Sequence, residues 1–247
     1  MNLQEFFTKY PKVALGFSGG VDSSFLLYAA HRYGADVKAI FVKSQFQPEF
    51  ELEDAKRLAE YVGVGFDVLH CDALSSEEVR KNPANRCYHC KNNIFGLIAK
   101  TAAEAGYEYI MDGTNASDEE GDRPGMRALK EMKVLSPLRM CGLTKADVRE
   151  LSREAGLFTW NKPSYACLAT RVPTGEEITD EKLARVEKAE TELASLGFSD
   201  FRVRLYGRGA RIQLPGSQMA GAVEMRKDIT EKLKPLFEVI MLDMEER

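Results

Sequence analysis

The stretch Lys12–Ser24 reads KVALGFSGGVDSS and decides the fold. Its first part, Lys12–Phe17, is a short apolar run between a proline and a Ser-Gly-Gly turn, which predicts a buried strand. A helix from Asp22 to Arg32 follows. Two glycines between a strand and a helix let the backbone approach an anion closely, and the helix start attracts negative charge. The sequence therefore predicts a phosphate-binding loop at Ser18–Ser24.

Strands and helices continue to alternate after this loop. Strands are predicted at Asp36–Val42, Phe66–Leu69 and Glu108–Met111, and helices at Glu49–Val62, Asn92–Ala105 and Thr144–Ala155. Such alternation predicts an α/β fold with a parallel sheet that is covered by helices on both faces.

The pattern changes after Gly175. A helix capped by Thr179 is followed by a predicted hairpin, Phe201–Tyr206 with Ala210–Leu214, then by a helix from about Gln218 to Leu233 and a last strand, Phe237–Leu242. We expect a nucleotide-type domain over residues 1–172 and a small α+β domain over residues 173–247.

Composition narrows the class of protein. The chain has 247 residues, a formal net charge of −4 and 44% hydrophobic residues, with an isoelectric point near 5.6. This balance favours a globular protein and disfavours one that holds nucleic acid through bulk charge. We expect no membrane segment, because no apolar run approaches about 18 residues. Five cysteines, an odd number, favour reduced thiols in the cytoplasm.

The loop Ser18–Ser24 differs from the two common phosphate loops. The chain contains no Gly-Lys dipeptide, hence no Walker A loop, and no GxGxxG fingerprint. The loop resembles the PP-loop of the ATP pyrophosphatase superfamily, whose members cleave ATP between its α and β phosphates. That resemblance implies that Ser18, Gly19, Gly20, Asp22 and Ser23 contact the pyrophosphate of ATP, together with magnesium. A similar Gly-Thr-Asn stretch in such proteins makes Gly113 a candidate nucleotide contact.

Carboxylates near the loop are candidate metal ligands. Asp118 and Glu119 follow the predicted fourth strand, where open α/β sheets place ligands, and Asp22 begins the helix after the phosphate loop. A solvated acidic loop is the alternative interpretation for Asp118 and Glu119.

Cys167 lies in the segment Asn161–Gly175, NKPSYACLATRVPTG, which joins the two predicted domains. A loop cysteine is more reactive than a buried one, and Arg171, four residues later, is placed to stabilise a thiolate. The alternative for Cys167 alone is an inert small apolar residue.

Three motifs in this order, SGGVDSS, Arg86–Lys91 (RCYHCK) and Ala166–Pro173 (ACLATRVP) with Gly175, resemble the LarE family of ATP-dependent sacrificial sulfur transferases. The resemblance implies adenylation of a carboxylate of pyridinium-3,5-biscarboxylic acid mononucleotide and attack by Cys167 on the acyl adenylate. Elimination then leaves dehydroalanine at Cys167 and a thiocarboxylate on the product, a precursor of the nickel-pincer nucleotide used by lactate racemase-type enzymes. It also implies that the protein forms a homo-oligomer and that its substrate is a small-molecule nucleotide.

Because that substrate carries a phosphate, the Arg-x-Arg pair Arg202 and Arg204 is a candidate phosphate site, with Arg171. The two side chains share one face of a predicted strand, and arginine forks match phosphate oxygens. A solvated strand face is the alternative.

Other enzyme classes stay open. Cys87 and Cys90 form a CxxC pair, which leaves room for an iron–sulfur cluster as sulfur carrier, although this option is not favoured with Cys167 alone in the linker. A PP-loop amide ligase or tRNA thiolase would need an ammonia source or a broad basic face, and neither is evident.

Overall fold

The structure is a computed structural model that describes residues 1–118 and 124–247. It divides into two compact units, Met1–Ala73 with Asn85–Lys162, and Leu74–Ala84 with Pro163–Arg247. The bounds of these two units differ from the expected ones, which placed a single boundary after residue 172. The short stretch Leu74–Ala84 joins the second unit because the Asn82 amide donates hydrogen bonds to the carbonyls of Val172 (3.3 Å) and Pro173 (2.8 Å).

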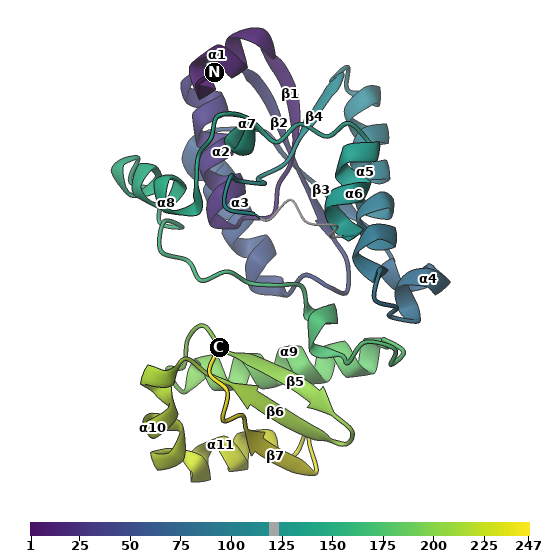
Figure 1. Cartoon of the computed structure of the whole chain (residues 1–247), viewed down its shortest axis with the longest axis vertical. Coiled ribbons are helices and arrows are strands. Elements are labelled where there is room, and N and C mark those ends of the chain that lie inside the picture. The colour runs from purple at the N-terminus through teal and green to yellow at the C-terminus, as the bar shows by residue number, and fades with distance from the viewer. Residues whose placement is uncertain (119–123) are drawn as a thin grey trace. The chain divides into compact units, whose positions relative to one another are not determined.

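The first unit carries the alternating strands and helices (Figure 1). Its elements are α1 (Leu3–Lys9), β1 (Lys12–Gly16), α2 (Val21–Arg32), β2 (Asp36–Lys43), α3 (Glu49–Val62), β3 (Phe66–His70), α5 (Arg86–Glu104), β4 (Tyr109–Met111), α6 (Pro124–Glu131), α7 (Pro137–Met140) and α8 (Lys145–Glu154). A short 3-10 turn, η1 (Ala73–Ser75), follows β3.

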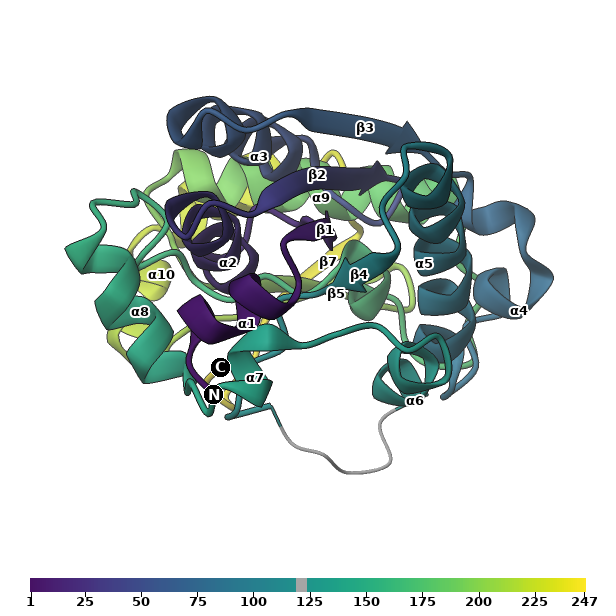
Figure 2. The ribbon, with the colours of Figure 1, turned by 90° about the horizontal axis from the view of Figure 1, so that it is seen from above.

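The sheet of this unit has the strand order β3-β2-β1-β4, and every pairing is parallel. Helices α1, α2 and α3 lie on one face and α5 and α6 on the other (Figure 2). Side-chain alternation along β1 explains the two layers: Val13 and Leu15 are buried in the core beneath α2 and α3, whereas Ala14 is buried with Phe95 and Ile98 of α5. The predicted α/β fold with a doubly covered parallel sheet is confirmed.

The order of the strands places a ligand site. The chain runs outward from β1 to β2 and β3, then returns to place β4 on the opposite side of β1. Open α/β sheets bind ligands beyond the carboxyl ends of strands, at the point where the strand order reverses. Here that point lies between the ends of β1 and β4, where the loops Phe17–Gly20 and Asp112–Asp118 begin.

The second unit is a small α+β structure. It contains α4 (Glu77–Arg80), η2 (Leu168–Arg171), α9 (Asp180–Ser195), β5 (Arg202–Tyr206), β6 (Gly209–Gln213), α10 (Gly216–Glu224), α11 (Arg226–Leu233) and β7 (Val239–Leu242). Strands β5 and β6 form the predicted hairpin, and β7 pairs parallel with β6. The residues Val186 and Leu193 of α9 and Val203 of β5 are buried, and α9 packs against β5.

Two of the predicted helices differ in their bounds from the observed ones. The helix predicted from Asn92 begins at Arg86, so the CxxC pair is helical; Asn85, after Pro83, marks the start. The helix predicted from Gln218 to Leu233 is two helices that meet at Met225. The helices α6 and α7 were not predicted, because their apolar faces are short. None of the helices in the described ranges combines the length and apolar character needed to cross a membrane.

Candidate functional site

The phosphate loop is held in shape by its own serines. The Ser18 and Ser23 hydroxyl oxygens lie 3.1 Å apart, and the Ser23 hydroxyl donates to the Gly20 carbonyl at 3.3 Å. The Gly20 amide points to the Ser18 hydroxyl at 3.5 Å. These local bonds fold the backbone over the start of α2.

The start of α2 is left open for an anion. Its N-cap is Gly20, and no side chain caps the first amides. The first turn of a helix has amide groups without intrahelical acceptors, and the helix dipole adds partial positive charge there. An uncapped start after two glycines therefore suits a phosphate group.

Two glycines allow the close packing around this loop. Gly19 has a φ of +69°, and a side chain there would meet Ala55 and the Glu51 carbonyl at 3.1 Å. At Gly113, an added Cβ would lie 2.9 Å from the Ser23 amide nitrogen. The structure therefore brings the predicted nucleotide contact Gly113 directly against the phosphate loop.

The loop after β4 is braced by its own polar groups. The Asp112 carboxylate accepts from the Thr114 hydroxyl (2.5 Å) and the Ser136 hydroxyl (2.8 Å), and Asp118 accepts from the Asn115 amide (2.9 Å). The Asn115 side chain donates to Asp22 at 3.2 Å. Asn115 thus ties the loop after β4 to the start of α2.

Two lysines that the sequence analysis did not identify reach the phosphate loop. The Lys145 ammonium pairs with Asp22, and the Lys162 ammonium lies 3.3 Å from the Gly19 carbonyl and 2.6 Å from Asp54. Both lysines are more than 120 residues from the loop in the chain. The loop motif has no lysine, and no local signal points to these two.

The predicted metal ligands fall into three groups. Asp22 faces Asn115 and Lys145, and Asp118 is a turn-forming acceptor, whereas Glu119 lies outside the described residues. Within residues 1–118 and 124–247, no three His, Cys, Asp or Glu side chains gather as metal ligands. Magnesium in nucleotide sites is held by one or two carboxylates plus substrate phosphates, and Asp22 suits that arrangement.

Cys167 is in the second unit, at the start of η2. Its side chain is partly exposed, and its carbonyl oxygen accepts from the Thr170 amide (3.0 Å) and hydroxyl (2.9 Å). Arg171 donates to the carbonyl of Ala166 at 2.8 Å and to that of Cys167 at 3.5 Å. The backbone around the cysteine is therefore fixed while the side chain stays accessible.

A buried ion pair anchors Arg171. Its Nε and Nη2 donate to the two carboxylate oxygens of Glu190 at 2.8 and 3.1 Å. Glu190 also accepts from the Tyr165 hydroxyl and from the Val203 amide. Glu190 lies on the inner face of α9 with Leu183, Val186 and Ala189, so its carboxylate is not part of the solvated face of that helix.

The Arg-x-Arg pair lies beside the same segment. Arg202 donates to the Ser164 carbonyl and Arg204 to the Thr170 carbonyl (2.6 Å). Burial, with the nearby Arg171, lowers the pKa of Arg202 to about 10. The same two causes lower the pKa of Arg204 and Arg247. These three guanidinium groups, whose charge is disfavoured by burial and by Arg171, favour the binding of an anion beside them.

Among the other cysteines, two are poor nucleophiles. Burial raises the pKa of Cys71 and of Cys141, so less of each is thiolate at neutral pH. Cys87 is exposed, and Cys90 is one turn further along α5.

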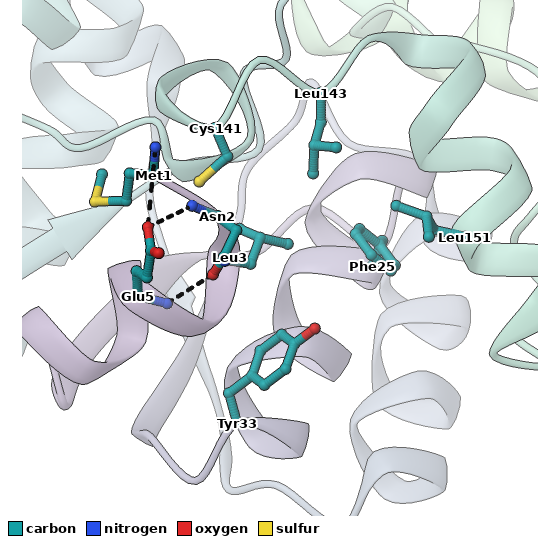
Figure 3. Close-up of a pocket in the computed structure, with 9 residues that line it drawn as sticks. All are labelled: Met1, Asn2, Leu3, Glu5, Phe25, Tyr33, Cys141, Leu143 and Leu151. Atoms are coloured by element: carbon teal, nitrogen blue, oxygen red, sulfur yellow. Dashed lines mark hydrogen bonds and ion pairs between the residues drawn. The ribbon is translucent and has the colours of Figure 1, made fainter.

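A hollow of about 530 Å³ lies elsewhere in the first unit, between α1, α2 and α8. Figure 3 shows its partly apolar wall and the contacts of Met1 and Asn2 with Glu5. No predicted site residue lines it. The lining residues are Met1, Asn2, Leu3, Glu5, Phe25, Tyr33, Cys141, Leu143 and Leu151.

Comparison with known proteins shows which family this chain resembles. Residues 12–176 match the family model of the queuosine biosynthesis protein QueC. An uncharacterized protein of Synechocystis is 38% identical over 90% of this chain and 84% of its own length. The pyridinium-3,5-bisthiocarboxylic acid mononucleotide synthase of Lactiplantibacillus plantarum is 33% identical over 94% of this chain and 86% of its own.

A more distant relative covers less of the chain. The tRNA-specific 2-thiouridylase MnmA of Clostridium acetobutylicum is 29% identical over 61% of this chain and 53% of its own length. The phosphate loop, the parallel sheet and the near full-length match to the synthase agree with one another. The chain therefore belongs to the LarE family, and its first unit has the PP-loop fold.

Proposed function

We propose that this chain is an ATP-dependent sulfur transferase of nickel-pincer nucleotide biosynthesis whose sulfur comes from Cys167. The observation that carries the proposal is the segment Ser164–Arg171, whose backbone is held by buried arginines while the Cys167 side chain stays accessible. The phosphate loop in the same chain supports the activation of a carboxylate. The relative from Lactiplantibacillus plantarum is named for a product of this class.

The reaction has three steps. A substrate carboxylate attacks the α phosphorus of ATP, which gives an acyl adenylate and releases pyrophosphate. The Cys167 thiolate then attacks the acyl carbon and AMP leaves, so a thioester joins protein and substrate. Removal of the Cα proton of Cys167 and cleavage of its Cβ–S bond release the thiocarboxylate and leave dehydroalanine.

The phosphate loop provides for the first step. Ser18, Gly19, Gly20, Asp22 and Ser23 contact the β and γ phosphates, and Gly113 allows the nucleotide to lie close to the backbone. Asp22 would hold magnesium together with the phosphates, and the ion would supply positive charge to the pyrophosphate leaving group. The open start of α2 supports these assignments.

The arginines of the second unit provide for the substrate. Arg202, Arg204 and Arg171 hold the phosphate of the pyridinium mononucleotide. The lowered pKa of Arg202, about 10, supports this role, because a bound phosphate would relieve the repulsion from Arg171. The same groups already orient the carbonyls of Ser164 and Thr170, so substrate binding and the position of the cysteine segment depend on one another.

An iron–sulfur cluster bound through the CxxC pair is the alternative source of sulfur. Cys87 and Cys90 are one helical turn apart on α5, which suits two ligands of one metal centre. In that case Cys167 would survive turnover.

The test is the intact mass of the protein before and after incubation with ATP, magnesium and the biscarboxylated mononucleotide. We expect the loss of one H₂S per chain, mapped to Cys167, together with one AMP. The variant Cys167→Ala should form AMP but no thiocarboxylate, and Cys141→Ala should behave as wild type. Formation of AMP and thiocarboxylate with no change in the mass of the protein would identify a cluster as the source of sulfur. If no AMP forms, the proposed ATP pyrophosphatase activity is wrong.

We also propose a homo-oligomer that acts in the cytoplasm on a small-molecule nucleotide. Size-exclusion chromatography with light scattering measures the mass of the protein in solution. A mass equal to one chain would contradict the homo-oligomer.

A further inference from the structure

Two lysine ammonium groups lie beside the phosphate loop of the first unit. The Lys162 ammonium lies between the Gly19 carbonyl (3.3 Å) and Asp54 (2.6 Å), with the ring of Phe50 5.5 Å from it. The Lys145 ammonium pairs with Asp22, the second residue of α2. Each cation thus contacts the loop that is shaped for an anion.

The position of each lysine is defined by the fold. Lys145 is the first residue of α8, after the N-cap Thr144, and its amide donates to the Ser117 hydroxyl at 2.9 Å. The Lys162 backbone carbonyl accepts from Arg149 of α8 at 2.9 Å. Lys145 thus belongs to α8 and Lys162 is bonded to it through Arg149, and both ammonium groups reach the phosphate loop.

The electrostatics favour an exchange of partners. Each lysine now faces one carboxylate, and both side chains are partly buried, with exposures of 15% for Lys162 and 30% for Lys145. A triphosphate carries several negative charges and offers more acceptor oxygens than a single carboxylate. An ammonium on a flexible four-carbon stem can turn from a carboxylate to a phosphate without a change in the backbone.

We propose that Lys162 and Lys145 are the cationic ligands of the triphosphate at the phosphate loop, and that Asp54 and Asp22 hold them when no nucleotide is bound. The assignment rests on the proposed use of ATP and adds two residues from outside the loop motif. They supply the charge that a lysine within the loop supplies in Walker A proteins.

Asp54 makes the idea testable, because it holds Lys162 but belongs to no proposed contact with the nucleotide. If Lys162 binds phosphate, Asp54 competes with the nucleotide, and Asp54→Asn frees the ammonium. If Lys162 only braces α3 against the loop, then Asp54→Asn and Lys162→Ala break the same bond. If Lys162 binds phosphate, the two substitutions have opposite effects on triphosphate affinity. If it only braces α3, they weaken the affinity equally.

The experiment is calorimetric titration of the full chain with α,β-methylene-ATP, which the reaction does not cleave, and with adenosine as a phosphate-free probe. We expect Lys162→Ala and Lys145→Ala to bind the triphosphate about 10- to 100-fold more weakly, the range of a charge-assisted hydrogen bond. Adenosine affinity should not change. Asp54→Asn should bind the triphosphate as tightly as wild type or more tightly, and Lys162→Arg should keep most of the affinity.

The control is Lys56→Ala, an exposed lysine on the same helix as Asp54, which should bind as wild type. Thermal unfolding of each variant confirms that it is folded. Unchanged triphosphate binding in Lys162→Ala, or equal weakening in Lys162→Ala and Asp54→Asn, would overturn the proposed role of the lysines but not the proposed function. A wild-type chain that binds neither the analogue nor ATP would overturn the proposed function as well.

Discussion

Arg171 and Glu190 form a two-pronged ion pair in the interior of the second unit, with side-chain exposures of 0% and 7%. One partner is on η2, beside Cys167, and the other is on α9. The pair therefore connects the segment that carries the cysteine to the core of its unit.

Loss of this pair should destabilise the second unit. Removal of one partner from a buried ion pair costs about 3–5 kcal/mol, because the remaining charge is left unpaired in the interior. We expect Glu190→Gln to lower the free energy of unfolding by an amount in this range, measured in urea. Glu181→Gln, on the exposed side of the same helix, should change it by less than about 0.5 kcal/mol. Equal stability of the two variants would contradict the structural role of Glu190.

Arg204→Ala should weaken binding of the phosphorylated substrate. A charge-assisted hydrogen bond to phosphate is worth about 1.5–3 kcal/mol, so the Kd should rise about 10- to 100-fold, while the Kd of the dephosphorylated nucleoside should not change. The control is Arg208→Ala, on the exposed turn of the same hairpin, where it pairs with Glu238. If both arginines have the same effect, the phosphate is bound elsewhere.

Gly113→Ala should impair nucleotide binding. The added methyl group would lie 2.9 Å from the Ser23 amide nitrogen, closer than a van der Waals contact allows, and would displace the start of α2. We expect calorimetry to detect little or no ATP binding. Gly96→Ala is the matched control, since nothing lies within 4 Å of the added group on α5. That variant should bind ATP normally and gain about 0.5–1 kcal/mol of stability.

Tyr107 should make the first unit sensitive to high pH. Burial and its hydrogen bond to Asp36 raise the pKa of the Tyr107 hydroxyl to about 12, from a usual 10. Between these values the unfolded chain has lost a proton that the folded chain keeps, so stability is complete below pH 10 and falls as the pH rises toward 12. Tyr107→Phe should flatten this part of the profile of unfolding free energy against pH, whereas Tyr61→Phe, at a residue 59% exposed, should not. A wild-type profile that is flat over this range would show that the hydroxyl is not protected.

Local signals were sufficient for most of the first unit. The strand before Ser18, the glycine loop and the helix after it are encoded by neighbouring residues, and the structure confirms all three. The hairpin around Gly207 was predicted for the same reason: short-range turn chemistry determines it.

Boundaries and partners required more than local signals. The start of α5 at Arg86 was missed because polar residues open the helix before its apolar face begins. The segment Leu74–Ala84 was assigned to the wrong neighbours along the chain, because its bonds are to residues about 90 positions away, at Val172 and Pro173.

The amino-acid sequence by itself determined the parallel α/β architecture and the position of the phosphate loop after the first strand. Each of these depends on residue types and spacing within a few turns of chain. Only the tertiary structure decided that Lys145 and Lys162 meet Asp22 and Asp54, and that Glu190 is a buried partner of Arg171 rather than a solvated residue. The physical reason is that ion pairs depend on distances in space, and a lysine or glutamate on a helix looks the same in sequence whether its partner is water or a charge brought there by the fold.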